Sequence, residues 1–245
     1  MRNIRLIIRY DGTKYNGWQK QGNTEQTIQG KMEQLLTKMT GESIELAGSG
    51  RTDAGVHALA QVANFHTHSS MTEKEMAEYM QEYLPKDIGI VEVKEVGERF
   101  HSRLNAVKKQ YEYRIYMGQE NPVFERKYCW HIQEPLNVEA IKKASESFIG
   151  QHDFKSFCGN KKMKKSTIRR IDEIQVIKDG NWLILRFTGN GFLMNMVRIL
   201  TGTLVEVGQG KKEVQDMEKI LLAKSREKAG MLAPAQGLFL VKVWY

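Results

Sequence analysis

Cysteine, proline and long apolar runs are scarce in this chain of 245 residues, and each shortage excludes a class of protein. The two cysteines, Cys129 and Cys158, lie far apart and in no paired motif. This argues against a disulfide scaffold and a thiolate zinc site, and it is typical of a reducing cytoplasm. No apolar run approaches the roughly 20 residues that a membrane span needs. Residues 1–10 alternate apolar with charged side chains, unlike a signal peptide. We therefore expect a cytoplasmic protein with no membrane partner.

Acidic residues are also fewer than basic ones, with 29 Asp and Glu compared with 37 Lys and Arg. The net charge is +8 and the isoelectric point is near 9.3. A basic surplus of this size indicates a polyanionic partner, and nucleic acid is the first candidate. The plainer alternative is a generally basic protein without such a partner, and composition alone leaves it open.

Apolar periodicity predicts the first strand and the first helix. Residues 4–10 alternate apolar side chains with arginines, which is the period of a strand. Residues 28–39 carry an apolar stripe with helical spacing. Asn23 is the expected N-cap of this helix, and Gly41 is its expected end.

The same patterns recur to the end of the chain. Thr72 and Glu75 form a capping box for a second helix, and Asp179-Gly180 is a strong hairpin signal between two later strands. The remaining expected elements are strands at about 61–67, 88–95, 109–117, 168–178, 181–188 and 238–245, and helices at about 72–85, 138–149, 194–206 and 212–223.

These elements predict an α+β architecture with two halves, residues 1–105 and 106–245, in which helices pack against strands. The four prolines and the absence of a serine-rich tract leave no linker between the halves. We therefore expect the halves to share a continuous sheet or a tight interface.

The sequence GSGRTDAGVHALAQ, residues 48–61, places Asp53 among glycines that allow close backbone approach. An Asp in such a loop commonly caps a turn or a helix. With Arg51 two residues away, the same carboxylate is suited to nucleophilic or acid–base chemistry. A metal site with His57, His66 and His68 would need a further carboxylate or thiolate, so we expect no metal. Capping and catalysis remain equal alternatives at this point.

Three basic segments also carry candidate site residues. FHSRLNAVKKQYEY, residues 100–113, contains Tyr111, which suits either a half-buried strand or stacking on an unstacked base. GNGFLMNMVR, residues 189–198, places Arg198 where it is either an exposed helix residue or a partner for a phosphate or for Asp53. GNKKMKKS, residues 159–166, is either a solvated loop or a contact for a nucleic-acid backbone.

Together with RYDGTKYNGWQKQ near the N-terminus and APAQGLFLVKV near the C-terminus, these motifs resemble the tRNA pseudouridine synthase A family. The resemblance runs in the same order from about residue 5 to the end, and the GRTDAGVHA block is its most specific part. Ser102 stands where the family usually has Ala, a small-for-small difference. The lysine-rich loop at 159–166 matches poorly.

The resemblance implies an isomerase that converts uridine to pseudouridine at positions 38, 39 and 40 in the anticodon stem-loop of tRNA. It implies a pseudouridine synthase fold whose two similar halves form an RNA-binding cleft, a homodimer, no DNA partner, no metal and no organic cofactor. Asp53 would be the nucleophile, attacking C1′ or C6 or removing a proton. Arg51, Tyr111 and Arg198 would complete the catalytic site and bind substrate, with His57 and Arg103 as further substrate contacts. The alternatives are a non-catalytic RNA-binding module and a metal-dependent nuclease.

Overall fold

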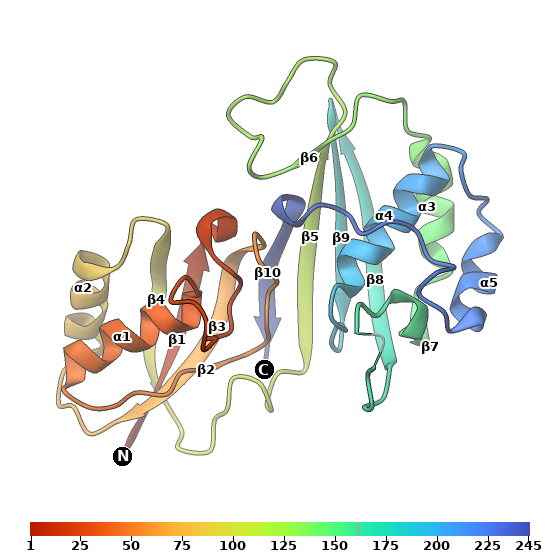
Figure 1. Ribbon diagram of the computed structural model, residues 1–245. Coiled ribbons are helices and arrows are strands. Elements are labelled where there is room, and N and C mark those ends of the chain that lie inside the picture. Colours follow the sequence, from red (N-terminus) through yellow and green to blue (C-terminus); the bar gives the residue numbers. More distant parts are fainter. Residues whose placement is uncertain (161) are drawn as a thin grey trace. The chain divides into compact units, whose positions relative to one another are not determined.

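The computed structural model describes residues 1–160 and 162–245, which fold into two compact units (Figure 1). The first unit contains Met1–Val107 together with Phe239–Tyr245, and the second contains Lys108–Leu238. Each unit combines its own strands with its own helices, so the α+β expectation is confirmed.

The first unit is built on a four-strand run in the order β4-β1-β3-β10, and the short β2 pairs with β3. β1 is antiparallel to both of its neighbours, whereas β10 joins β3 in parallel through Phe239↔His57 and Leu240↔Ala58. The strands are β1 (Arg2–Tyr10), β2 (Ala47–Gly48), β3 (His57–Thr67), β4 (Ile88–Val96) and β10 (Leu238–Trp244).

Two neighbouring helices, α1 (Ile28–Thr40) and α2 (Glu73–Tyr83), contribute further side chains to the first core (Figure 1). The even-numbered side chains from Ile4 to Tyr10 in β1 are almost fully buried, whereas Arg9 is exposed, as the alternation predicted. Burying these apolar side chains away from water is the main stabilising contribution of such a layer. The two helices add Met32, Leu36, Met76 and Met80, none of which has exposed surface.

The ends of these helices test the capping predictions. The capping box of Thr72 and Glu75 at the start of α2 is confirmed. The prediction that Asn23 caps the first helix is wrong, because Thr27 is the N-cap and its hydroxyl accepts a hydrogen bond from the Gly30 amide at 3.2 Å. Both residue types cap well, and only the backbone path shows which of them reaches an open amide.

The second unit contains an antiparallel run in the order β5-β9-β8-β7, and the short β6 pairs in parallel with β5. The predicted hairpin between β8 and β9 is confirmed, with Gly180 in the left-handed region at φ +53°. The elements are β5 (Lys108–Tyr116), β6 (Trp130–His131), β7 (Gly150–Asp153), β8 (Ile168–Asp179), β9 (Trp182–Gly189), α3 (Val138–Glu146), α4 (Met196–Gly208) and α5 (Asp216–Ala223).

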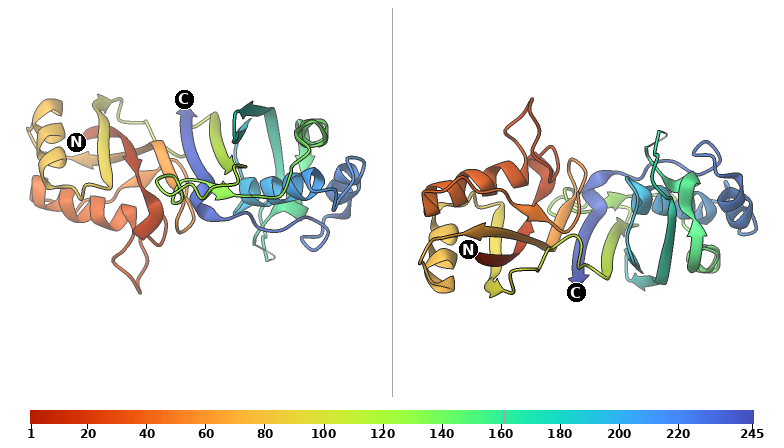
Figure 2. Two further views of the ribbon diagram at one scale, coloured as in Figure 1. Left: turned by 90° about the horizontal axis from the view of Figure 1, so that it is seen from above. Right: turned by 90° about the horizontal axis from the view of Figure 1, so that it is seen from below.

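The central helix of the second unit is α4, which is buried along nearly its whole length and packs against α3 (Figure 2). Gly202 lies in its middle, and a Cβ there would collide with the backbone carbonyl of Met231. The missing side chain therefore permits the segment around residue 231 to cross the helix at close range. No helix among the described residues is long and apolar enough to cross a membrane.

We predict that Gly202→Ala destabilises the protein although helix propensity alone would favour alanine by about 1 kcal/mol. Displacing a backbone carbonyl in a packed interior is expected to lower the free energy of unfolding by about 2 kcal/mol. Denaturant unfolding measures the difference, and Gly22→Ala is the control because a Cβ at that position meets no atom within 4 Å. A stabilised Gly202→Ala protein would contradict the close crossing.

Candidate active site

The Asp53 loop, residues 49–56, connects β2 to β3 and is anchored by the backbone on both sides of Asp53. The Ser49 amide donates to the Val62 carbonyl at 2.7 Å, and the Gly55 amide donates to the Tyr15 carbonyl at 3.3 Å. The Thr52 carbonyl accepts a hydrogen bond from the Trp18 amide at 3.1 Å. The carboxylate of Asp53, which is half-buried, therefore projects from a backbone whose path is fixed.

Buried side chains add a second set of anchors. The Gln61 amide group accepts from the Ser49 hydroxyl at 2.7 Å and donates to the Gly50 carbonyl at 3.0 Å. The hydroxyls of Tyr10 and Thr52 share a hydrogen bond of 2.8 Å. Burial of Tyr10 raises the pKa of its phenol well above the ordinary value, so the group stays neutral and can donate. The loop thus has little freedom to redirect Asp53.

Residues 11–18 pack directly onto this loop because their glycines lack side chains. Gly17 has φ +90°, and a Cβ there would lie 2.6 Å from the Thr52 carbonyl oxygen. A Cβ on Gly12 would overlap the Val56 carbonyl. At the other end of the loop, Gly48 leaves room for the indole ring of Trp18, which is 2% exposed. The glycines of both motifs therefore serve one close contact between two loops.

Arg51 is exposed but its orientation is set by a chain of amide side chains. Its Nε donates to Gln19 Oε1 at 2.9 Å, and Gln19 Nε2 donates to Gln29 Oε1 at 2.7 Å. Gln29 Nε2 in turn donates to Glu33 Oε1 on α1 at 3.0 Å. Sequence reasoning missed Gln19 and Gln29, although the run GWQ beside a glycine loop offered a weak signal.

His57 and Arg103, the two further predicted substrate contacts, differ sharply in exposure. His57 is 1% exposed, stacks on Phe239 with ring centroids 4.8 Å apart, and accepts the Gly12 amide at Nδ1 over 3.0 Å. Its ring has almost no surface to offer to RNA, and it instead ties residue 12 to the start of β3. Arg103 is exposed on the loop before β5.

Tyr111 and Arg198 belong to the second unit. Tyr111 lies on β5, is 8% exposed, and meets the ring of Phe192 edge-on at 5.2 Å. Arg198 lies in the first turn of α4, where its Nε donates to the Ala233 carbonyl at 2.8 Å and its own carbonyl accepts the Ala233 amide. Each side chain is thus held by the packing of its own unit.

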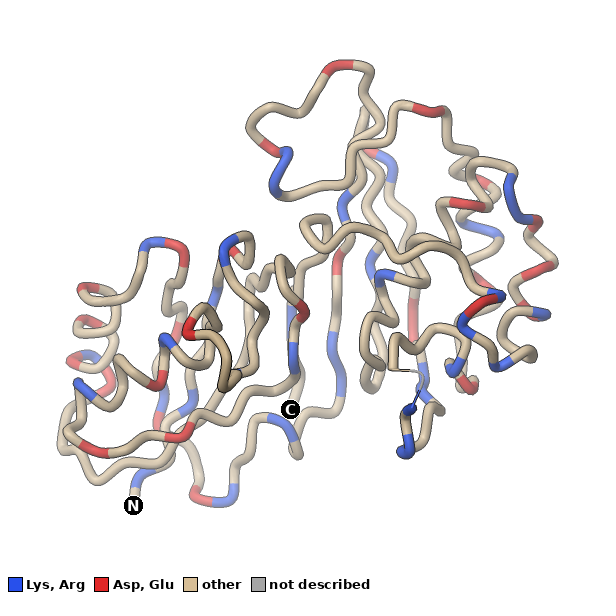
Figure 3. The backbone as a smooth tube through the Cα atoms, in the orientation of Figure 1, with Lys and Arg blue, Asp and Glu red and all other residues tan. Residues whose placement is uncertain are grey.

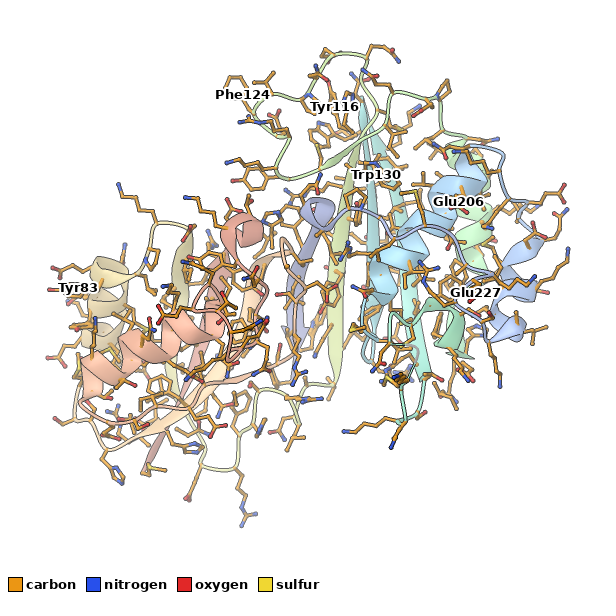
Figure 4. All side chains as sticks on the ribbon, in the orientation of Figure 1. Tyr83, Tyr116, Phe124, Trp130, Glu206 and Glu227 are labelled. Atoms are coloured by element: carbon orange, nitrogen blue, oxygen red, sulfur yellow. The ribbon has the colours of Figure 1, made fainter. Side chains whose placement is uncertain are left out.

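The face of β5 opposite Tyr111 carries a buried carboxylate. Glu112 accepts from Arg114 Nε at 2.8 Å and from Arg186 Nε at 2.7 Å, and its side chain is 6% exposed. Burial opposes its ionisation, but the hydrogen bonds from both arginines outweigh burial and lower the pKa of Glu112. Along the same strand, Tyr113 packs edge-on against Trp130, with ring centroids 6.4 Å apart; Trp130 is labelled in Figure 4. These contacts fix β5 on both faces around Tyr111.

The described part of the chain contains no group of three or more His, Cys, Asp or Glu side chains that could hold a metal ion. His68, one of the three histidines considered for a metal site, lies with its Nδ1 3.6 Å from Glu42 Oε2. The candidate side chains are Asp53 and Arg51 in the first unit, a carboxylate and a guanidinium, and Tyr111 and Arg198 in the second, a phenol and a guanidinium.

A family model described as "tRNA pseudouridine synthase" matches residues 6–105 and 144–245. The chain therefore belongs to the tRNA pseudouridine synthase family, which makes it an isomerase that acts on tRNA, and the resemblance seen in its motifs is confirmed.

Curated relatives match along their whole length. The chain is 48% identical over 245 residues to tRNA pseudouridine synthase A 1 of Clostridium tetani, covering 100% of both chains. It is 48% identical over 240 residues to tRNA pseudouridine synthase A of a Bacillus species, covering 98% of both. A solved Cbf5-Nop10-Gar1 complex matches with a TM-score of 0.39 and 11% identity over 97% of this chain and 48% of that one, too low a likeness to support an argument.

We predict that Glu112→Gln lowers the free energy of unfolding by about 1–2 kcal/mol at neutral pH, because hydrogen bonds to a charged partner are lost. Since the pKa of Glu112 is lowered in the folded state, its contribution is present above the unfolded value of about 4.3 and is lost as the pH falls through the folded value. Unfolding at a series of pH values should therefore show the gap between wild type and variant closing in acid. Glu95→Gln, which removes a more exposed pair with Arg2, should cost less at every pH.

Proposed function

We propose that this enzyme isomerises uridine at positions 38, 39 and 40 in the anticodon stem-loop of tRNA, with Asp53 as the nucleophile. The observation that carries the proposal is the half-buried Asp53 carboxylate on a loop held by Trp18, Tyr15 and Gln61. A group that attacks one atom of a large substrate must be oriented before the substrate arrives, and this anchoring supplies that orientation.

The chemistry explains why one fixed carboxylate suits the reaction. The C1′–N1 bond of uridine breaks, the uracil turns, C1′ bonds to C5, and the C5 proton is lost while N1 regains one. A base stacked in a stem cannot turn, so the nucleotide must leave the helix at a cost of a few kcal/mol. Phosphate contacts with the basic protein offset that cost. Asp53 then needs only to reach the sugar or the base of the extruded nucleotide.

The remaining residues take supporting roles in this proposal. Tyr111 stacks on the detached uracil, and its hydroxyl assists loss of the C5 proton. Arg51 and Arg198 fill the space left by the base. Arg103 contacts phosphates from its exposed loop. His57 acts indirectly, because its ring nitrogen holds residue 12 against the Asp53 loop.

The proposal includes a cytoplasmic homodimer that binds tRNA and uses neither a metal nor an organic cofactor. The net charge of +8 supports a polyanionic substrate. The relatives named above are tRNA enzymes, which supports RNA rather than DNA as that substrate.

Asp53→Asn is the decisive substitution, because it keeps the shape of the side chain and removes its charge. We expect pseudouridine formation to become undetectable while tRNA affinity stays within about twofold of wild type, since phosphate contacts lie elsewhere. Release of tritium from C5-labelled uridine in tRNA measures turnover, and filter binding measures affinity. Asp216→Asn, a half-buried position at the start of α5, is the matched control.

If pure Asp53→Asn protein turned over at a measurable rate, the carboxylate would be a capping group, because Asn caps nearly as well as Asp. Loss of both turnover and binding would indicate a disturbed loop instead of a missing nucleophile. Only lost turnover with retained binding separates an enzyme from a non-catalytic RNA-binding module.

Gln19→Ala should lower kcat about fivefold to tenfold, because it removes the hydrogen bond that orients Arg51 Nε. In an Arg51→Ala background the same change should add less than about twofold, since the oriented group is gone. Single-turnover assays on all four proteins of this cycle give the comparison. Gln21→Ala is the control, because Gln21 lies in the same loop but donates to the Asn16 carbonyl. Equal losses in both backgrounds would mean that Gln19 acts on the fold alone.

A further inference from the structure

A pocket of about 440 Å³ in the second unit lies apart from every residue assigned above. Its walls come from η2 (Phe154–Phe157), the loop that leads to β8, and the turn that follows α5. Figure 3 shows lysines and arginines along this loop and this turn, and Glu227 at the turn is labelled in Figure 4. The lining residues are Asp153, Lys155, Cys158, Asn160, Met163, Lys165, Thr167, Lys224, Ser225, Arg226 and Glu227.

Four of the lining side chains are cationic, and most of their charge is not neutralised within the protein. Among the described residues, Lys155, Lys165 and Arg226 have no carboxylate within ion-pair distance. Arg226 donates only to backbone carbonyls, with the Gly230 oxygen at 2.9 Å. Lys224 pairs with Asp153 at 3.2 Å. The pocket therefore offers an excess of positive charge on a concave surface.

Two acidic residues, Asp153 and Glu227, also line the pocket, so its four cations leave a net charge of +2. The oxygens of Asp153 are already engaged within the wall. Asp153 accepts hydrogen bonds from the Lys155 amide at 3.2 Å and from the Thr167 hydroxyl, in addition to its pair with Lys224. These donors hold the carboxylate in the wall, where it positions the ammonium of Lys224. Lys155 and Lys165 are exposed at the rim and can reach an incoming anion.

Hydrogen bonds to neighbouring elements hold the walls of the pocket in place. The Ser156 hydroxyl donates to the Ile220 carbonyl at 2.6 Å and accepts the Ser225 amide at 2.9 Å, which joins η2 to the turn after α5. On the other side, the Gly159 amide donates to the Met194 carbonyl at 2.8 Å. A Cβ on Gly159 would overlap the Asn195 side chain, so the loop begins in close contact with the start of α4.

We propose that this pocket binds a backbone phosphodiester of the RNA substrate, at a nucleotide other than the one that reacts. The proposal rests on the proposed function, because that function supplies a polyanion large enough to reach a second site. Phosphates are the sequence-independent contact points of such a substrate, and clustered Lys and Arg are their usual partners. The lysine-rich loop at 159–166 thereby becomes an RNA contact rather than a merely solvated loop; its Lys161 lies outside the described residues.

The double variant Lys155→Gln/Lys165→Gln tests the pocket without touching a residue of the catalytic site. We expect its Kd for tRNA to rise about tenfold at low salt, and the slope of log Kd against log salt to fall by roughly 1.5, about 0.7–0.9 for each lost contact. The KM for tRNA should rise in proportion and kcat should stay unchanged, because a phosphate contact binds ground state and transition state equally.

The matched control is Lys38→Gln/Lys74→Gln, which removes the same charge from exposed positions on α1 and α2. An equal loss of tRNA affinity in the control would mean that the effect comes from net charge alone, and this would overturn the proposal. An unchanged Kd in the pocket variant would also overturn it. Titration with millimolar inorganic phosphate forms a second arm. Phosphate binding that the pocket variant loses, without any change in tRNA affinity, would identify a site for free anions and also contradict the proposal.

Binding is measured in an Asp53→Asn background as well, so that the two proposals fail separately. If wild-type protein forms no pseudouridine, the proposed function fails whatever the pocket does. If wild-type protein forms pseudouridine but the pocket variant has the same tRNA affinity as its control variant, the phosphodiester site alone is excluded.

Discussion

The close packing of residues 11–18 against the Asp53 loop is the constraint on which the candidate site depends. Two carbonyls of that loop, at Thr52 and Val56, occupy the space where Gly17 and Gly12 would otherwise carry a side chain. Backbone approach at this distance is open only to glycine, and it allows amides of one loop to bond carbonyls of the other. The Asp53 carboxylate is therefore positioned by main-chain geometry, which is stiffer than any side-chain contact.

Amide side chains extend this rigid core outward to the guanidinium of Arg51. Gln61 holds the loop from below, and Gln19 with Gln29 connects Arg51 to a carboxylate on α1. Glutamine suits the task because one group both donates and accepts, so a chain of them can pass on orientation without adding charge. A carboxylate in these places would form an ion pair with Arg51, whereas glutamine orients the guanidinium without placing a negative charge beside it.

The sequence predicted the local elements of the fold better than its long-range contacts. Spacing identified the strands, the capping box and the Asp53 loop, since each depends on neighbours in the chain. It failed where the outcome depends on distant contacts. Thr27 rather than Asn23 caps α1 because of where the backbone turns, and β10 lies beside β3 although nearly the whole chain separates them. The burial of His57 under Phe239 follows from that pairing, so no local pattern could reveal it.

Charged side chains serve two purposes in this protein, and the two purposes require opposite surroundings. Cations that bind phosphates act at the surface, where each contributes a modest, salt-dependent amount and loss of one is tolerated. In the proposed function the Asp53 carboxylate does the chemistry, and anchoring with partial shielding from water suits this role because electrostatic interactions are stronger there. Glu112 shows the cost of burying a carboxylate outside the site, since two arginines are needed to keep it charged. A protein with a net charge of +8 can therefore afford many exposed lysines but only a few buried acids, each with a defined partner.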